Sequence, residues 1–111
     1  MKLLTLFRHG KSEWETGAED DFDRPLKDRG RKDTPMMGKF LASIGATPDL
    51  LVSSPATRAR QTAELLAPAS GYAVEIRWEE SIYAASAGEL MSLLRHLPDE
   101  AGHVLLVGHN P

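Results

Sequence analysis

The chain has 111 residues, of which 41% are hydrophobic and 26% are charged, with a formal net charge of -3 and no cysteine. This length and composition fit one soluble folded domain, and the net negative charge argues against a general nucleic-acid binder. The lack of cysteine excludes a disulfide framework, a thiolate–zinc site and a phosphatase with a cysteine nucleophile.

The first residues form a short apolar run that predicts a strand. The run is Leu3–Phe7, and Arg8 and His9 follow it at once. It is too short for the hydrophobic region of a signal peptide or for a membrane span. We therefore expect a buried strand, no membrane association and, by default, a cytoplasmic location.

Three later apolar runs have the same character and predict three further strands. They are Leu50–Val52, Val74–Trp78 and Val104–Val107. Short runs of this kind fit strands that are covered on both faces of a sheet.

The stretch between the first two strands has the periodicity of a helix, with a terminator at Gly45. Thr34-Pro35 fits an N-cap followed by the first helical residue, so we expect the helix to begin there. A helix reaching back to Asp28 would have to kink at Pro35. Its apolar stripe is Met36, Met37, Phe40, Leu41 and Ile44.

Two more helices are predicted, each followed by a strand. One begins at Ser54-Pro55 and runs to Pro68, and the other covers Ala87–Leu97 with its leucines on one side. Strands that alternate with helices favour an α/β fold of three layers, a mostly parallel sheet flanked by helices. With no repeat or linker in the sequence, we expect residues 1–111 to form a single domain.

Histidines and arginines follow three of the predicted strands at their carboxyl ends. Arg8-His9-Gly10 follows the first strand, Ser53-Ser54-Pro55 follows the second with Arg58 shortly after, and Gly108-His109-Asn110 follows the fourth. Ligands of open parallel sheets bind at this edge. The sequence therefore predicts a cationic pocket for one phosphate.

These residue types suit the transfer of a phosphoryl group. The fork of an arginine can hold two phosphate oxygens, and it keeps its charge at any ordinary pH. A neutral imidazole can attack phosphorus, which suits His9, while a protonated His109 would stabilise charge in the transition state. Taken singly, each residue has a plainer interpretation as a packing, capping or solvated side chain.

The three segments together resemble the histidine phosphatase superfamily, the phosphoglycerate-mutase-like fold. The segments are Arg8-His9-Gly10, the run from Ser53 to Ala63, and Gly108-His109-Asn110. Within that superfamily the chain is similar to SixA-type phosphohistidine phosphatases, because Asp23-Arg24-Pro25-Leu26 resembles their arginine-proline-leucine segment and no inserted lid follows Val74.

The resemblance implies roles for the residues that match its motifs. Arg8 and Arg58 would bind the phosphate, His9 would be phosphorylated, and His109 would be the second pocket histidine. Arg24 would be a further phosphate contact, although it can equally be a loop arginine paired with a neighbouring aspartate. No cofactor and no metal is implied.

Two more residues have alternative interpretations. Glu80 stands where the mutase-like branch has the glutamate that protonates the leaving oxygen, but a solvated acidic turn explains it as well. Ser12 can donate a hydrogen bond to the phosphate, or it can cap the following segment Glu13–Glu15.

The resemblance also implies that the C-terminal part of the fold is missing, because members of the family continue beyond the second histidine. We expect a phosphatase that hydrolyses phosphohistidine on a protein, for example a histidine phosphotransfer domain of a bacterial signalling pathway. A phosphatase for small phosphorylated metabolites is an alternative. A phosphate-binding module made inactive by truncation after His109 is another.

Overall fold

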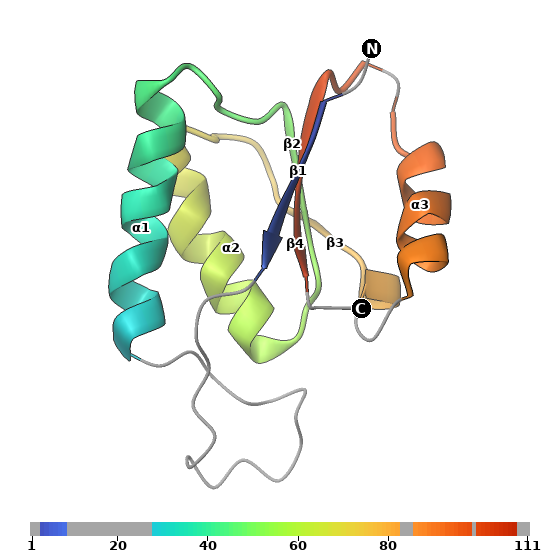
Figure 1. Ribbon diagram of the computed structural model, residues 1–111, viewed down its shortest axis with the longest axis horizontal. Coiled ribbons are helices and arrows are strands. Elements are labelled where there is room, and N and C mark those ends of the chain that lie inside the picture. Colours follow the sequence, from blue (N-terminus) through green and yellow to red (C-terminus); the bar gives the residue numbers. More distant parts are fainter. Residues whose placement is uncertain (1–2, 9–27, 83–85, 99, 109–111) are drawn as a thin grey trace, which may run out of the picture.

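The computed structural model describes residues 3–8, 28–82, 86–98 and 100–108. In this part of the chain, strands and helices alternate (Figure 1). The strands are β1 (Leu3–Arg8), β2 (Leu50–Ser53), β3 (Arg77–Trp78) and β4 (His103–Gly108). The α-helices are α1 (Asp28–Ser43), α2 (Thr57–Ser70) and α3 (Ala87–Arg95), and a short 3-10 helix, η2, covers Glu80–Ile82.

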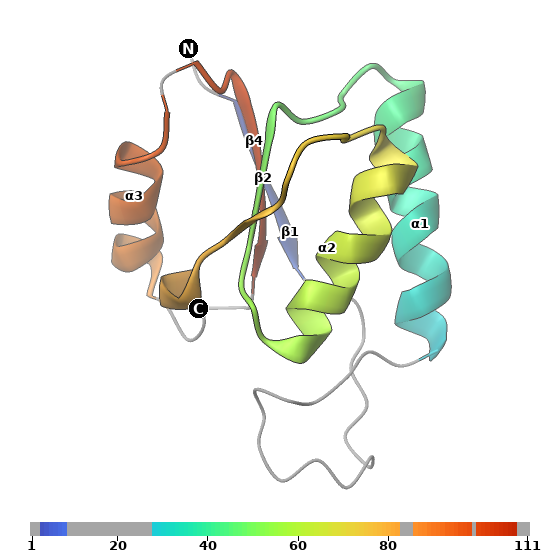
Figure 2. The ribbon, with the colours of Figure 1, turned by 180° about the vertical axis from the view of Figure 1, so that it is seen from behind.

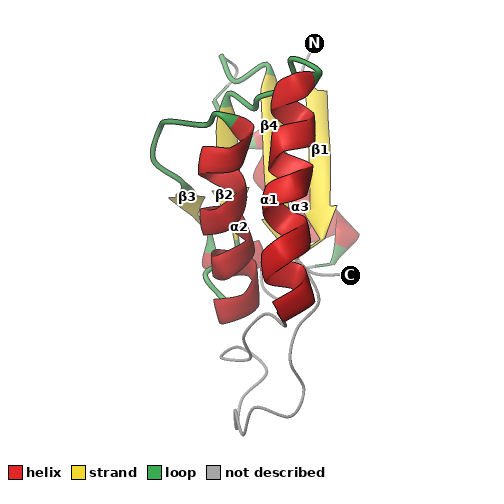
Figure 3. Cartoon of the chain, turned by 90° about the vertical axis from the view of Figure 1, so that its left-hand side faces the viewer, coloured by secondary structure: helices red, strands yellow, loops and turns green. Residues whose placement is uncertain are grey.

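The strands form one parallel sheet in the order β1-β4-β2-β3. Helices α1 and α2 cover one face of this sheet and α3 covers the other (Figures 1 and 2). Seen from the side, α2 lies between α1 and β3 (Figure 3). The structure therefore confirms the predicted three-layer α/β fold with a parallel sheet.

The core lies on both faces of β4, whose residues are buried along its whole length. Leu105 and Val107 pack with residues of α2, whereas Val104 and Leu106 pack with Leu97 on the α3 side. A strand that is covered on both faces has no polar face, and this explains why the sequence of β4 contains a continuous apolar run.

Helix α1 begins at Asp28, so the expected start at Thr34-Pro35 is wrong. Pro35 lies inside the helix, where a proline removes one hydrogen bond and costs about 3 kcal/mol. The side of the helix that carries Gly30, Thr34 and Gly38 is buried. The packing of these small residues outweighs the cost of Pro35, and local sequence does not reveal that packing.

The apolar stripe that marks α1 in the sequence is not the buried side of the helix. Only Leu41 packs against the core. A Cβ atom on Gly38 would lie 2.7 Å from Ala69 Cβ, so α1 approaches α2 closely through its small residues. The other four stripe residues are exposed: Met36, Met37, Phe40 and Ile44.

Helix α2 begins later than predicted and ends later. Its first residue is Thr57, and Ser54 precedes it in a turn where its Oγ accepts a hydrogen bond from Ala56 N at 3.2 Å. The helix continues past Pro68 to Ser70. It stops where Gly71 adopts a left-handed conformation with φ 84°, which glycine tolerates without steric cost.

The third predicted strand is shorter than expected. Pairing with β2 is confined to Arg77 and Trp78, and Val74, where the strand was expected to start, is exposed. The chain reaches β3 through an extended segment in which Ile76 packs against the core.

Helix α3 begins at Ala87 as predicted and ends at Arg95, two residues before the expected end at Leu97. A capping box opens it: Ser86 Oγ accepts from Glu89 N, and the Glu89 carboxylate accepts from Ser86 N. The backbone hydrogen bond from Ser86, followed by its side-chain hydrogen bond, lowers the pKa of Glu89 from its usual 4.5. In the described part of the chain, no helix combines the length and apolar character needed to cross a membrane.

Candidate active site

The carboxyl ends of three strands lie level with one another. Arg8, the last residue of β1, is paired with Gly108, the last residue of β4. Ser53, the last residue of β2, is paired with Val107. The chain continues from two of these ends directly into His9 and His109.

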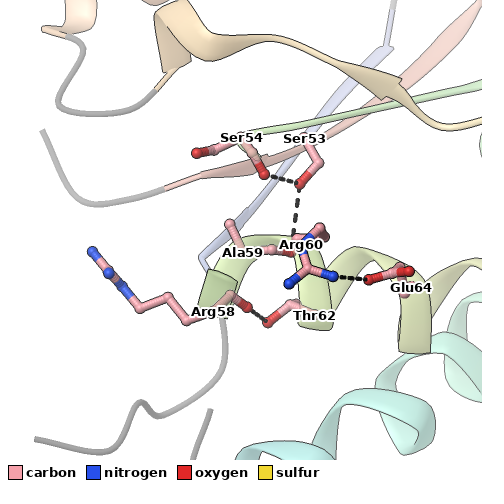
Figure 4. A network of polar contacts seen from close by, with 7 residues as sticks. All are labelled: Ser53, Ser54, Arg58, Ala59, Arg60, Thr62 and Glu64. Atoms are coloured by element: carbon pink, nitrogen blue, oxygen red, sulfur yellow. Dashed lines mark hydrogen bonds and ion pairs between the residues drawn. The ribbon is translucent and has the colours of Figure 1, made fainter. Parts of the chain in front are cut away.

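The turn that follows β2 is fixed to the sheet by hydrogen bonds. Ser54 N donates to Val107 O at 3.1 Å, so the pairing with β4 extends one residue beyond β2. Ser53 Oγ donates to Ser54 O at 2.9 Å and is 3.4 Å from Ala59 O (Figure 4). Both serines are fully buried. The turn therefore holds the beginning of α2 against the carboxyl edge of the sheet.

Arg58 lies in the first turn of α2 at this edge, and it is only 4% exposed. Its carbonyl oxygen accepts a hydrogen bond from Thr62 Oγ1 at 2.8 Å. Its side chain extends away from the other labelled residues of the turn and the helix (Figure 4). An arginine is seldom buried to this degree unless it serves an anion or a polar group.

Arg60 behaves differently, although it lies only two residues further along. Its side chain is 46% exposed and forms an ion pair with Glu64, with 3.2 Å between Nη1 and Oε1 (Figure 4). Residues two apart on a helix point in different directions. Of these two arginines, Arg58 alone is buried.

Glu80 begins η2, which packs at the same edge. Ile82 of η2 is buried, and its Cγ2 would lie 2.9 Å from a Cβ atom placed on Gly108. Glu79, just before η2, donates its backbone N–H to Ser53 O and pairs with Arg77 at 2.9 Å. Glu80 itself is exposed. Two strand ends, those of β2 and β4, therefore position the turn that carries Glu80.

Several predicted site residues lie outside the described residues: His9, Ser12, Arg24 and His109. Arg8 is placed as the end of β1. The remaining two, Arg58 and Glu80, are both at the carboxyl edge. Among the described residues, no group of three or more His, Asp or Glu side chains is placed to hold a metal ion.

Ser53 and Ser54 organise this edge, although the sequence predicted only a helix N-cap at Ser54 and no separate role for Ser53. The sequence does contain a signal for this turn, because two serines stand between an apolar strand and a proline. Serine side chains readily form hydrogen bonds with nearby backbone groups. His103 is buried at the opposite end of β4, and its backbone N–H donates to Asp49 Oδ2 at 2.8 Å.

Similarity to known proteins identifies the family of this chain. Residues 4–105 match the model of the histidine phosphatase superfamily (branch 1). The chain belongs to this superfamily. An uncharacterized protein of Mycobacterium tuberculosis (strain H37Rv) is 36% identical over 104 residues, which are 94% of this chain and 63% of that protein. An uncharacterized chloroplastic protein of Arabidopsis thaliana is 32% identical, over 98% of this chain and 54% of that protein.

Solved structures of histidine phosphatases share the fold. A protein of Agrobacterium tumefaciens assigned as a SixA phosphohistidine phosphatase has a TM-score of 0.87 at 33% identity, covering 97% of this chain and 69% of that one. A similarly assigned protein of Nakamurella has a TM-score of 0.83 at 31% identity, covering 99% and 60%. The chain thus spans roughly three fifths of the length of the mycobacterial and Nakamurella relatives.

Proposed function

We propose that the chain is a phosphatase that hydrolyses phosphohistidine on proteins through a covalent intermediate on His9. The observation that carries this proposal is the burial of Arg58 at the edge where β1 and β4 end in register. Those strands lead directly into His9 and His109. Membership of the histidine phosphatase superfamily and the likeness to proteins assigned as SixA phosphohistidine phosphatases support the same conclusion.

The electrostatics of the edge favour an anion. The first turn of α2 lies at the positive end of the helix dipole, and it contains no acidic residue. Arg58 adds a full charge in a buried setting, where electrostatic interactions are stronger than in water. In the proposal, Arg8 and Arg58 hold the phosphoryl oxygens, with Arg24 and Ser12 as further contacts.

The reaction has two steps, and no cofactor takes part. In the first, an imidazole nitrogen of His9 forms a bond to phosphorus while the bond from phosphorus to the substrate histidine breaks, and the leaving imidazole takes up a proton. In the second, the oxygen of a water molecule forms a bond to phosphorus while the bond from phosphorus to His9 breaks, a proton from the water restores the neutral imidazole of His9, and inorganic phosphate leaves. A protonated His109 stabilises the charge that builds on the phosphoryl oxygens, and Glu80 is the candidate proton donor.

The experiment is phosphorus NMR of phosphate release from a phosphohistidine peptide, in the presence of a metal chelator. The wild type should release phosphate and form a phosphoenzyme that is stable in alkali and labile in acid, whereas His9→Ala should do neither. Arg58→Ala should lower kcat/KM by about 10²-fold or more. Arg60→Ala is the matched control, because it removes an arginine that is exposed and paired with Glu64.

Three results would contradict the proposal. Turnover that survives His9→Ala would exclude the covalent intermediate, and equal losses in the two arginine variants would remove the special role of Arg58. Phosphate binding without turnover of any substrate would favour a binding module instead.

A further inference from the structure

Trp78 is a large aromatic residue at the same end of the sheet as the candidate active site. It is the last residue of β3, it is paired with Ser53 in β2, and the residue is 41% exposed. Ser53 leads through the turn at Ser54 to Arg58. One strand spacing, about 5 Å, therefore separates the backbone of Trp78 from the strand that leads into the site.

The side chain of Trp78 lies on the α2 face of the sheet. Residues paired in a parallel ladder share a face, and Ser53 Oγ lies against Ala59 O of α2. On α2, the Arg60–Glu64 pair lies on the opposite side from Ala69, which Gly38 of α1 contacts. This pair thus lies on the side of α2 that is turned away from α1.

The backbone of Trp78 points outward from the sheet. Glu79 N donates to Ser53 O at 2.9 Å, so the backbone N–H and C=O of Glu79 face β2. Those of Arg77, two residues before it, face β2 as well. In a parallel ladder the residue between them directs its N–H and C=O the other way. In the described part of the sheet β3 pairs with β2 alone, so these two groups of Trp78 face the open edge.

The outward N–H and C=O of Trp78, together with its exposed indole, form a surface that is complementary to an extended polypeptide. The main-chain groups can form hydrogen bonds with a peptide backbone, and the indole offers an apolar anchor of the kind that dominates peptide binding. A small phosphorylated metabolite would fill the phosphate pocket alone and leave this edge unused.

We propose that Trp78 and the outer edge of β3 dock the polypeptide around the phosphorylated side chain of a protein substrate. This inference rests on the proposed function and specifies its substrate class. Two strand spacings, about 10 Å, separate β3 from β4, and an extended chain covers that distance in about three residues. Residues within about three positions of the phosphohistidine therefore contact Trp78.

The test compares a heptapeptide that has phosphohistidine at its centre with phosphoramidate, which has no peptide. Trp78→Ala should raise KM for the peptide about tenfold with kcat unchanged, and it should leave phosphoramidate hydrolysis unchanged. Trp78→Phe should restore most of the peptide affinity. Phe40→Ala is the matched control, because Phe40 is an aromatic residue of α1 with 55% exposure, and it should change neither substrate.

Equal peptide KM values for the wild type and Trp78→Ala would overturn the inference while leaving the phosphatase proposal intact. A wild-type dimer that Trp78→Ala dissociates, with peptide KM unchanged, would assign this edge to a second copy of the chain instead. If neither substrate is hydrolysed, the proposed function fails. Docking is then tested by measuring the Kd of a heptapeptide that contains a stable phosphohistidine analogue. Weaker binding in Trp78→Ala would still support docking, whereas equal binding or none would overturn it.

Discussion

Gly108 and Ile82 pack so closely that a Cβ atom on Gly108 would lie 2.9 Å from Ile82 Cγ2. This separation is shorter than an ordinary carbon–carbon contact of about 3.5–4.0 Å. Gly108 ends β4 and directly precedes His109, while Ile82 ends the short helix that Glu80 begins. One contact thus couples a strand end that leads to a candidate pocket histidine with the turn that holds the candidate proton donor.

Replacing Gly108 by alanine should destabilise the protein and displace η2. Ile82 is buried, so the added methyl group has to push its side chain aside, at a cost of about 1–3 kcal/mol. Urea unfolding measures the loss. Gly102→Ala is the control, because its Cβ would meet only Asp49 Oδ2 at 3.4 Å. Equal stability of the two variants would show that the contact between Gly108 and Ile82 is not tight.

The contact between α1 and α2 predicts opposite effects for two glycines that both lie in helices. Gly38→Ala should cost about 1–3 kcal/mol, because the new Cβ would lie 2.7 Å from Ala69 Cβ and 3.0 Å from Leu66 O. Gly88→Ala in α3 should stabilise the protein by about 0.5–1 kcal/mol, since its nearest contact is Ser86 Oγ at 3.9 Å and alanine favours helix. Thermal unfolding of the two variants checks this, and a stabilising Gly38→Ala would contradict the close approach of the helices.

The capping box of α3 predicts a pH dependence of stability. Hydrogen bonds from the backbone and side chain of Ser86 lower the pKa of Glu89 in the folded state, so the unfolded chain binds the proton more readily. The contribution is therefore fully present above the ordinary pKa of 4.5, and it is lost as the pH falls through the lower folded-state value.

Glu89→Gln isolates this effect, because its amide oxygen can still accept from Ser86 N but does not titrate over this range. The wild type should be the more stable of the two in urea at pH 7, and the difference should shrink as the pH falls below 4.5. Glu100→Gln, a change at an exposed residue outside the capping box, should show no such trend. A difference that grows on acidification would contradict the assignment.

The parts of the fold that local sequence decides were predictable. Buried parallel strands read as short apolar runs, and the leucine face of α3 packs on the core as its spacing indicates. The misassigned parts depend on tertiary packing. Helix α1 passes through Pro35 because its small residues pack on α2, and its apolar stripe apart from Leu41 is exposed for the same reason. Only the neighbouring helix reveals which side of α1 is buried.

The candidate site was predictable where it follows from strand order. Parallel strands bring the residues after each of them to one edge, and Arg58 lies in the first turn of α2 at that edge, while its role as a phosphate ligand stays a prediction. The turn of Glu80 was not predictable as a helix, because η2 forms where Ile82 packs beneath Gly108. The edge position of Trp78 likewise depends on the shortening of β3 to two residues.

Glu80 should matter for phosphate esters and little for phosphohistidine. An alkoxide is a poor leaving group that needs a proton in the transition state, and general acids contribute about 10²–10⁴-fold to such steps. The imidazole of phosphohistidine leaves more easily. Glu80→Gln should therefore lower kcat for an alkyl phosphate about 10²-fold or more and leave phosphohistidine cleavage largely intact.

Glu79→Gln is the matched control, because Glu79 is the adjacent carboxylate and is paired with Arg77 at 2.9 Å. Initial rates of both variants on both substrates complete the comparison. Equal losses for the two substrates in Glu80→Gln would show that Glu80 is not a leaving-group acid. An ester-specific loss in Glu79→Gln instead would transfer that role to Glu79, whose backbone N–H is already fixed to Ser53 O at the end of β2.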